Sequence, residues 1–201
     1  MAFTFFFRDT HTLEHAARIL APEVAGRSRI RVWDAGCAMG PEPYTAAMIL
    51  AEYMGHFSFK NLTIDATDID EQDQFGIIIN NAVYTEEETQ RIPEEIFKKY
   101  FEKCADKPGF VKVNELIKSK IKFQKHDLLT LQTIGEGYSL IVCKNVLLHF
   151  QQSERIEVIK MFHKSLEKGG FFVTEQTQKM PEELEHLFER VVPDAQLYKK
   201  V

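Results

Sequence analysis

Between residues 31 and 44 the chain reads Arg31-Val32-Trp33-Asp34-Ala35-Gly36-Cys37-Ala38-Met39-Gly40-Pro41-Glu42-Pro43-Tyr44: an apolar strand, a turn with two glycines, and the start of a helix. Glycine has no Cβ, so backbone amides in such a turn can lie against a nucleotide-like cofactor. The spacing departs from the G-x-G-x-x-G of dinucleotide-binding loops, which favours S-adenosylmethionine over a dinucleotide. We therefore interpret this turn as a cofactor loop, although two-glycine turns also occur for purely structural reasons.

On both sides of this loop, segments that fit strands alternate with segments that fit helices. Strands are expected at 29–33, 62–67, 139–143 and 171–174, and helices at 10–20, 41–55, 71–81 and 153–166. This alternation predicts parallel βαβ units and therefore an α/β fold with a doubly wound, Rossmann-like, mostly parallel sheet. Near the C-terminus, Gly169-Gly170 is expected to end the preceding helix, a last helix to begin near Pro181, and Gln196-Leu197-Tyr198 to close the sheet edge.

The length and composition predict one domain. A chain of 201 residues, 44% of them hydrophobic, can bury one substantial core, so residues 1–201 are interpreted as a single domain. Within it, residues 105–123 are expected to form a small antiparallel β-subdomain. The turn Lys107-Pro108-Gly109 precedes the alternating segment Phe110–Val113, and a second alternating stretch begins at Ile121.

Composition also limits the cellular compartments and the partners that fit this chain. No apolar run approaches the roughly 18 residues of a membrane span, and no secretory signal is evident, so membrane insertion is not expected. The three cysteines, Cys37, Cys104 and Cys143, lack metal-like spacing, which fits reduced thiols in a cytoplasm. A formal net charge of −5 argues against general nucleic-acid binding.

The charge is distributed unevenly. Residues 98–125 carry a formal charge of +6 and the rest of the chain −11. The simpler interpretation is a solvated lysine-rich face, and the sharper one is a surface that receives an acidic partner. The nine lysines of this segment are Lys98, Lys99, Lys103, Lys107, Lys112, Lys118, Lys120, Lys122 and Lys125.

Polar residues follow the expected strands, where ligands bind in open α/β sheets. Asp68 ends the second strand, and a carboxylate there can accept both ribose hydroxyls of an adenosine. Alternatively Asp68 caps the next helix, a role for which Asp70 is better placed. Glu42, in the first turn after the glycine loop, can face a cationic sulfonium or amino group. Alternatively, it is simply stabilised there by the helix N-terminus.

Two further segments complete the candidate site. Asp127-Leu128 and Cys143-Lys144-Asn145-Val146 stand at the ends of the third and fourth strands, when the alternating stretch that begins at Ile121 is counted as the third. The Asn145 amide can bind an adenine edge or the methionine part of a cofactor, or Asn145 is an ordinary turn residue.

Other chemistries find little support in the sequence. His11 and His15 have the i, i+4 spacing of helical zinc ligands, but the H-E-x-x-H pattern is absent and no third ligand is evident. We therefore expect a surface pair and no metal site. The nucleophile-elbow and P-loop motifs are also absent, which removes those hydrolase and NTPase interpretations.

The chain resembles the chemotaxis receptor glutamate O-methyltransferases, the CheR-type family that uses S-adenosylmethionine. The motifs occur in the family's order over nearly the whole chain. They are Thr4-Phe5-Phe6-Phe7-Arg8 for T-x-F-F-R, Trp33–Tyr44 for W-S-A-G-C-S-x-G-E-E-P-Y, Ala66–Asp70 for A-[ST]-D-I-D, Cys143–Phe150 for C-R-N-V-x-I-Y-F, and Leu166–Gly170 for L-x-P-G-G.

This resemblance implies a methyltransferase fold with a small β-subdomain, here 99–123, that docks the receptor. It implies S-adenosylmethionine as cofactor and S-adenosylhomocysteine as product. Arg8 would also hold the substrate carboxylate, and His149, in place of a family tyrosine, would lie near the transferring methyl. The implied cofactor contacts are Thr4, Arg8, Glu42, Asp68, Asp127, Leu128, Asn145 and Val146, to which the loop adds Asp34 and Gly36.

Three features depart from the family pattern. The family has a helical domain ahead of T-x-F-F-R, whereas this chain begins almost at that motif, so a substrate-binding surface is expected to be missing. His149 replaces an aromatic hydroxyl with a titratable imidazole. Pro41 replaces the first acid of G-E-E-P-Y, and Asp34 stands where serine is frequent, which implies altered contacts to the cofactor amino group.

The leading hypothesis is a cytoplasmic methyltransferase that methylates a glutamate on an acidic helical partner, such as the cytoplasmic domain of a chemoreceptor. A second hypothesis is a module that binds S-adenosylmethionine or S-adenosylhomocysteine with weak or no catalysis. A third is a methyltransferase for RNA or a small molecule, with the lysine-rich face as a phosphate-binding surface. A nicotinamide-dependent dehydrogenase is the remaining alternative at the level of the fold.

Overall fold

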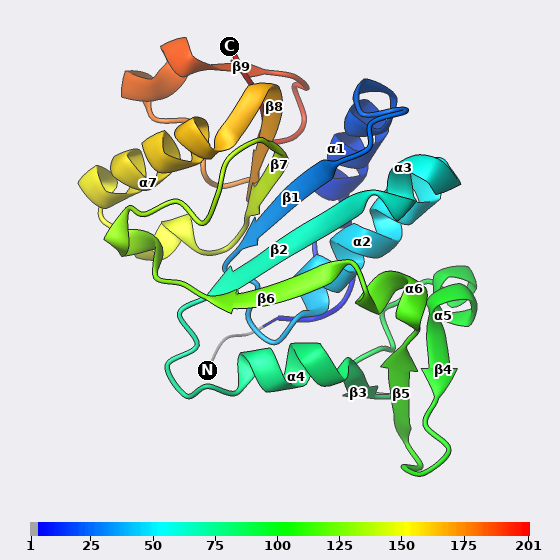
Figure 1. The fold of residues 1–201 in the computed structure, drawn as a ribbon. Helices are drawn as coiled ribbons and strands as arrows, with labels where there is room; N and C mark the ends of the chain where they lie inside the picture. The colour runs from blue at the N-terminus through cyan, green and yellow to red at the C-terminus, as the bar shows by residue number, and fades with distance from the viewer. Residues whose placement is uncertain (1–3) are drawn as a thin grey trace.

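The computed structural model describes residues 4–201, and its main element is a twisted sheet between two layers of helices (Figure 1). Within this range the sheet has seven strands in the order β6-β2-β1-β7-β8-β10-β9. Strands β6, β2, β1, β7 and β8 are parallel, and β10 runs antiparallel to both β8 and β9. The strands are β1 (Ile30–Ala35), β2 (Leu62–Asp68), β6 (Ile121–Lys125), β7 (Tyr138–Cys143), β8 (Leu166–Thr174), β9 (Phe188–Arg190) and β10 (Leu197–Lys200). The mostly parallel α/β sheet expected from the sequence is therefore confirmed.

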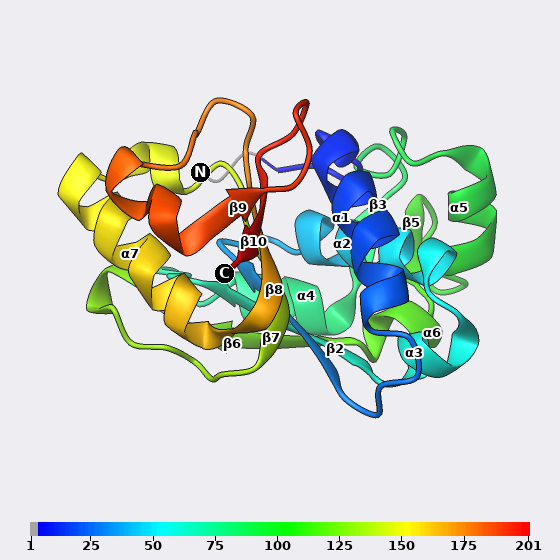
Figure 2. The same cartoon turned by 90° about the horizontal axis from the view of Figure 1, so that it is seen from above.

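Helices cover both faces of the sheet, as the view from above shows (Figure 2). Helices α1 (Thr10–Glu23), α2 (Pro41–Tyr53) and α3 (His56–Lys60) lie on one side, and α7 (Gln152–Ser165) lies on the other. Neighbouring strand residues alternate between the two cores: Val32 packs with the first group of helices, and Trp33 packs with α7. This alternation follows from the period of two in a β-strand.

A smaller antiparallel sheet, β3-β5-β4, stands beside α2 and α4 (Phe75–Asn81). It contains β3 (Val83–Thr85), β4 (Phe101–Lys103) and β5 (Phe110–Val113), with α5 (Glu94–Tyr100) and α6 (Glu115–Lys118) around it. The bounds expected from the sequence, 105–123, differ from these strands at both ends. Two strands come earlier, and residues 121–123 belong to β6, which pairs in parallel with β2 in the main sheet.

Some expected element boundaries were wrong. Gly169-Gly170 does not end α7, which stops at Ser165; both glycines lie inside β8. A Cβ on Gly170 would lie 2.8 Å from the Tyr138 carbonyl oxygen, so close approach of β7 explains this glycine. The segment after Pro181 is the 3₁₀ helix η3 (Glu182–Leu187), and the sheet edge is β9 rather than β10.

Among residues 4–201, none of the helices combines the length and the apolar character that crossing a membrane requires.

Candidate cofactor and active site

A cavity of about 490 Å³ opens at the carboxyl ends of the central strands. It is lined by residues from the N-terminal segment, the turn after β1, the end of β2 and the segment after β7. Eight of the eleven site residues predicted from the sequence line it: Thr4, Arg8, Gly36, Glu42, Asp68, Asn145, Val146 and His149. The fold thus brings together residues that are up to 145 positions apart in the chain.

The glycine turn forms one wall of the cavity. Gly36 has φ 98° and Gly40 has φ 102°, a backbone conformation that favours glycine. A Cβ on Gly36 would lie 2.1 Å from Cγ2 of Val146, so a side chain at this position requires Val146 to move. Pro41 then begins α2, where its missing N–H costs no helical hydrogen bond.

Asp68 is fixed at the end of β2 by the same turn. Its Oδ2 accepts a hydrogen bond from the Ala38 backbone N–H at 2.9 Å, and its Oδ1 accepts one from the Asp70 N–H at 3.3 Å. Asp70, not Asp68, satisfies the start of α4, because it accepts from the backbone N–H groups of Gln74, Phe75 and Gly76. Burial raises the pKa of Asp70, but these amides outweigh it and hold the pKa below the ordinary value.

Lys144 organises the floor of the site, although the sequence analysis assigned it no role. Its side chain is only 1% exposed, with Nζ 3.4 Å from Glu42 Oε2. The same Nζ donates to the carbonyl oxygens of Arg8 and Asp9, both at 3.2 Å. Lys144 therefore ties together the end of β7, the first turn of α2 and the segment that carries Arg8. Its place in the Cys143–Phe150 motif was visible, but its complete burial was not.

Asp34 lies beneath the cavity rather than in its lining. The residue is fully buried, and neither carboxyl oxygen has a hydrogen-bond partner among residues 4–201. Burial, followed by repulsion from Glu42, raises the pKa of Asp34 well above its ordinary value, and Lys144 only partly opposes this. A buried carboxyl group without partners is costly unless it is protonated or meets a cation.

Two more carboxyl groups with buried oxygens belong to this cluster, Glu42 beside Lys144 and Glu175 near Glu42. Burial raises the pKa of Glu42, while Lys144 and Arg8 lower it. Glu175, which follows β8, accepts hydrogen bonds from the Asn145 N–H at 3.0 Å and the Thr174 hydroxyl at 2.8 Å. Oε1 of Glu42 and Oε1 of Glu175 are both buried, without a partner in the described part of the chain. Glu175 was missed by sequence reasoning, since no motif marks it.

Arg8 and His149 lie at the more exposed side of the cavity. The Arg8 side chain is 28% exposed, with Nε 3.6 Å from Asp9 Oδ2 and its guanidinium 5.7 Å from the centre of the Phe5 ring. His149 is the exposed last residue of the 3₁₀ helix η2 (Leu147–His149). Both side chains are accessible to a molecule that enters from solvent.

Asp127 and Leu128 do not line the cavity. They follow β6 at the same edge of the sheet, and the preceding His126 N–H donates to the Asp68 carbonyl oxygen at 2.8 Å. Asp127 Oδ1 accepts from the Leu129 N–H at 2.9 Å, so Asp127 caps the short 3₁₀ helix η1 (Leu128–Thr130). Their predicted cofactor contacts stay predictions.

The site fits S-adenosylmethionine, which combines a ribose, an amino-acid tail and a positively charged sulfur. Gly36 leaves room for backbone approach, and the Asp68 carboxylate borders the cavity. Asp34, Glu42 and Glu175 each have at least one buried carboxyl oxygen without a partner within residues 4–201. These three acidic groups share one buried cation, Lys144. This excess of buried carboxyl groups favours a cationic ligand.

Comparison with known proteins gives concordant matches. A family model described as "CheR methyltransferase, SAM binding domain" matches residues 2–195. A chemotaxis protein methyltransferase of Borreliella burgdorferi is 31% identical over 182 residues, covering 85% of this chain and 62% of that protein. One from Listeria monocytogenes is 29% identical over 167 residues, covering 82% of this chain and 60% of that protein. The chain therefore spans about three fifths of the length of these relatives.

Among solved structures, the chain is similar to the N-methyltransferase NodS from Bradyrhizobium japonicum in complex with S-adenosyl-L-homocysteine. The TM-score is 0.41 at 18% identity, and the match covers 80% of this chain and 58% of that chain.

Proposed function

This chain belongs to the family of the CheR methyltransferases, as their S-adenosylmethionine-binding domain, and from that premise we propose that it methylates a glutamate side chain of a chemoreceptor-like protein. The observation that carries the proposal is the single cavity that joins Asp68 and Glu42 to the accessible Arg8 and His149. One set of residues suits a cationic nucleoside cofactor, and the other can meet an acceptor from solvent.

Methyl transfer to a glutamate requires alignment of its carboxylate with the methyl group more than it requires a catalytic base. A glutamate side chain has a pKa of about 4.3, so at neutral pH its carboxylate is already the nucleophile. The bound cofactor supplies an electrophilic methyl group on a sulfonium sulfur. Arg8 orients the acceptor carboxylate by a charge-assisted hydrogen bond, which places one carboxylate oxygen in line with that methyl.

The remaining residues hold the cofactor. Asp68 accepts hydrogen bonds from the ribose hydroxyls, and the Gly36 turn lies against the amino-acid tail. Glu42, which lines the cavity, stabilises the ammonium group of that tail, and the nearby buried carboxyl groups of Asp34 and Glu175 make its surroundings acidic. Asn145 and Val146 bind the adenosyl part, together with Thr4, Asp127 and Leu128.

His149 positions the acceptor near the transferring methyl. It takes the place of a tyrosine in the family motif and presents an imidazole at the exposed side of the cavity. This substitution favours one second candidate function, a module that binds S-adenosylmethionine or S-adenosylhomocysteine with little turnover. Tight cofactor binding without turnover, unchanged in His149→Tyr, supports that second candidate. Turnover by the natural chain contradicts it.

The partner is an acidic helical protein such as the cytoplasmic domain of a chemoreceptor, and the protein acts in the cytoplasm. The lysine-rich segment 98–125 supports the first statement. The three unpaired cysteines, Cys37, Cys104 and Cys143, support the second.

The test is transfer of labelled methyl from S-adenosylmethionine to a chemoreceptor fragment, followed by release of methanol with base. Arg8→Ala should lower kcat/KM by at least about 100-fold, because it removes a charge-assisted contact to the acceptor. Arg29→Ala, at an exposed arginine before β1, is the matched control and should leave transfer unchanged. Absence of base-labile product with every acidic helical fragment tried would contradict the proposal.

A further inference from the structure

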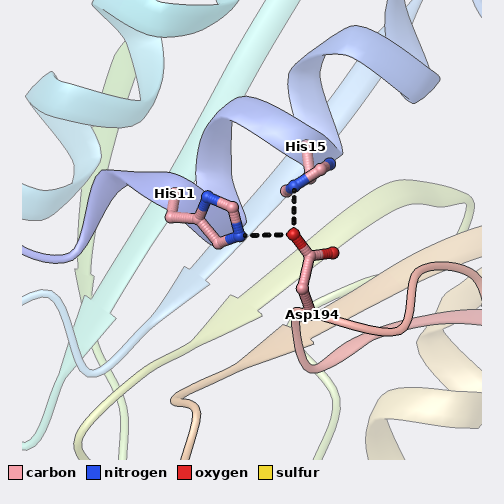
Figure 3. A group of neighbouring side chains, drawn as sticks. All are labelled: His11, His15 and Asp194. Carbon is pink, nitrogen blue, oxygen red and sulfur yellow. Dashed lines mark hydrogen bonds and ion pairs between the residues drawn. The ribbon is translucent and has the colours of Figure 1, made fainter.

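Three metal-ligating side chains meet on the surface between α1 and the turn that joins β9 to β10 (Figure 3). His11 and His15 occupy neighbouring turns of α1, and Asp194 reaches them from the C-terminal part of the chain. Asp194 Oδ2 is 3.0 Å from His11 Nε2 and 3.4 Å from His15 Nε2. The fold thus supplies the third ligand that the sequence did not reveal.

The spacing of these atoms suits a late first-row divalent metal ion. Around Zn²⁺, bonds of about 2.0–2.2 Å to nitrogen and oxygen place tetrahedral ligand atoms about 3.3–3.6 Å apart. The 3.4 Å between His15 Nε2 and Asp194 Oδ2 lies in this range, and the 3.0 Å between His11 Nε2 and Asp194 Oδ2 lies slightly below it. The three ligand atoms all lie within 4.8 Å of one another. The His11 side chain is more than half exposed and can rotate to adjust the position of its Nε2. Two imidazoles and one carboxylate leave a fourth position for water.

The third ligand comes from a well-held turn. The Arg190 guanidinium donates to the carbonyl oxygens of Pro193 and Ala195, at 3.0 and 3.1 Å, on either side of Asp194. The Gln176 side-chain amide donates to the Asp194 carbonyl oxygen at 2.5 Å. The backbone on both sides of Asp194 is therefore held by hydrogen bonds, which lowers the entropic cost of ordering a metal site.

The contacts of His15 without a metal ion show which hydrogen bonds metal binding must change. Arg18 Nη2 lies 2.6 Å from His15 Nδ1, so Nδ1 accepts the hydrogen bond and Nε2 carries the proton that Asp194 accepts. When a metal binds Nε2, the ring proton moves from Nε2 to Nδ1, and the Arg18 guanidinium, which can only donate, turns away toward solvent. No buried group has to move.

We propose that His11, His15 and Asp194 form a binding site for a late first-row divalent cation, of which Zn²⁺ is the representative. The site is separate from the cofactor cavity. It joins the first turns of α1, which directly follow Arg8 and Asp9, to the β9–β10 turn. A bound ion therefore cross-links two segments that are 183 residues apart.

The experiment is a Zn²⁺ titration of the full chain in competition with a chromophoric chelator, repeated with Co²⁺ to observe its visible absorption. We expect one ion per chain and a higher thermal unfolding midpoint with Zn²⁺. His11→Ala and Asp194→Asn should each weaken Zn²⁺ binding by more than about 10-fold, since loss of even an outer-shell partner has effects of that size. Both side chains are more than half exposed, so the variants should fold.

Two control variants separate this site from adventitious ones. His186→Gln removes an exposed histidine elsewhere, and Cys104→Ser removes the least buried cysteine. Both should bind Zn²⁺ as the natural chain does. Equal binding by the natural chain and Asp194→Asn, loss of binding in Cys104→Ser, or no binding at all would each overturn the proposal.

Discussion

At the scale of single residues, Gly36 is the glycine at which an added Cβ would make the shortest contact. It combines φ 98° with a Val146 methyl group 2.1 Å from where a Cβ would stand. We predict that Gly36→Ala lowers the free energy of unfolding by about 3 kcal/mol, the sum of left-handed backbone strain and overpacking. Urea denaturation measures the change.

Gly26→Ala is the matched control for Gly36→Ala. Gly26 also has a positive φ, 77°, but no atom lies within 4 Å of its added Cβ. Only backbone strain remains, about 1 kcal/mol. If the two substitutions cost the same, close approach of Val146 is not what requires glycine in the cofactor loop.

Asp34 gives a prediction for the dependence of stability on pH. Burial and the neighbouring Glu42 raise the pKa of Asp34, so between its ordinary and raised values the folded chain binds more protons than the unfolded chain. The free energy of unfolding therefore falls as pH rises through this window. Asp34→Asn should flatten that fall and be more stable than the natural chain by about 1–3 kcal/mol at its upper end.

The measurement is urea denaturation of the cofactor-free protein from about pH 5 to pH 8. Asp106→Asn removes an exposed carboxylate and should keep the slope of the natural chain. Some slope should survive in Asp34→Asn, because burial also raises the pKa of Glu42. Parallel curves for the natural chain and Asp34→Asn would show that Asp34 does not titrate differently in the two states.

At the scale of elements, Lys144 connects β7, α2 and the N-terminal segment. Lys144→Met leaves Glu42 buried without its cation and removes two hydrogen bonds to the backbone of Arg8 and Asp9. We predict a loss of about 3–5 kcal/mol in the free energy of unfolding, the range for breaking a buried ion pair. The double variant Lys144→Met/Glu42→Gln should recover part of it, because position 42 then no longer carries an uncompensated charge.

A double-mutant cycle on these two positions, followed by urea denaturation, checks this prediction. Lys160→Met is the control, since Lys160 pairs with Glu157 on the exposed face of α7. Strictly additive losses from Lys144→Met and Glu42→Gln would show that the two side chains are not coupled.

The same scale shows what the sequence could predict. Strand β7 and the second half of β8 were predicted because they are continuous apolar runs, as strands buried on both faces must be. Strand β6 was not assigned to the main sheet, because Ile121–Lys125 alternates apolar and polar residues like a half-exposed strand. The three-residue strands β3, β4 and β9 were not predicted, since so short a segment carries no period of its own and is defined by its partner strands. Gly169-Gly170 was misread because a helix stop and a close approach between strands both use glycine.

The candidate site divides in a similar way. Residues in or next to the glycine loop and at strand ends, such as Glu42 and Asp68, were predictable because parallel strands end at one edge of the sheet. Lys144 and Glu175, and Asp194 in the separate surface site, were not, because their roles depend on burial and on contacts between distant segments. A sequence shows the charge of a side chain but not whether it is buried or which groups surround it.

At the scale of the whole molecule, charge is separated between two regions. Residues 98–125 carry +6 on a chain whose net charge is −5. Part of this charge is already paired, as in Lys99 with Glu52 and Lys125 with Asp73. Lys103 and Lys107 lie exposed on β4 and the turn toward β5, on the opposite side of the molecule from α7 (Figure 1).

We predict that reversing both charges, Lys103→Glu with Lys107→Glu, slows association with an acidic chemoreceptor fragment by about 10-fold at low salt, because oppositely charged surfaces steer the encounter. Stopped-flow binding over a range of salt concentrations measures the rate, and its salt dependence should become shallower. Lys164→Glu with Lys168→Glu changes net charge equally at exposed positions at the end of α7 and in β8. Equal slowing by both pairs would assign the effect to net charge alone, leaving the lysine-rich segment without a specific docking role.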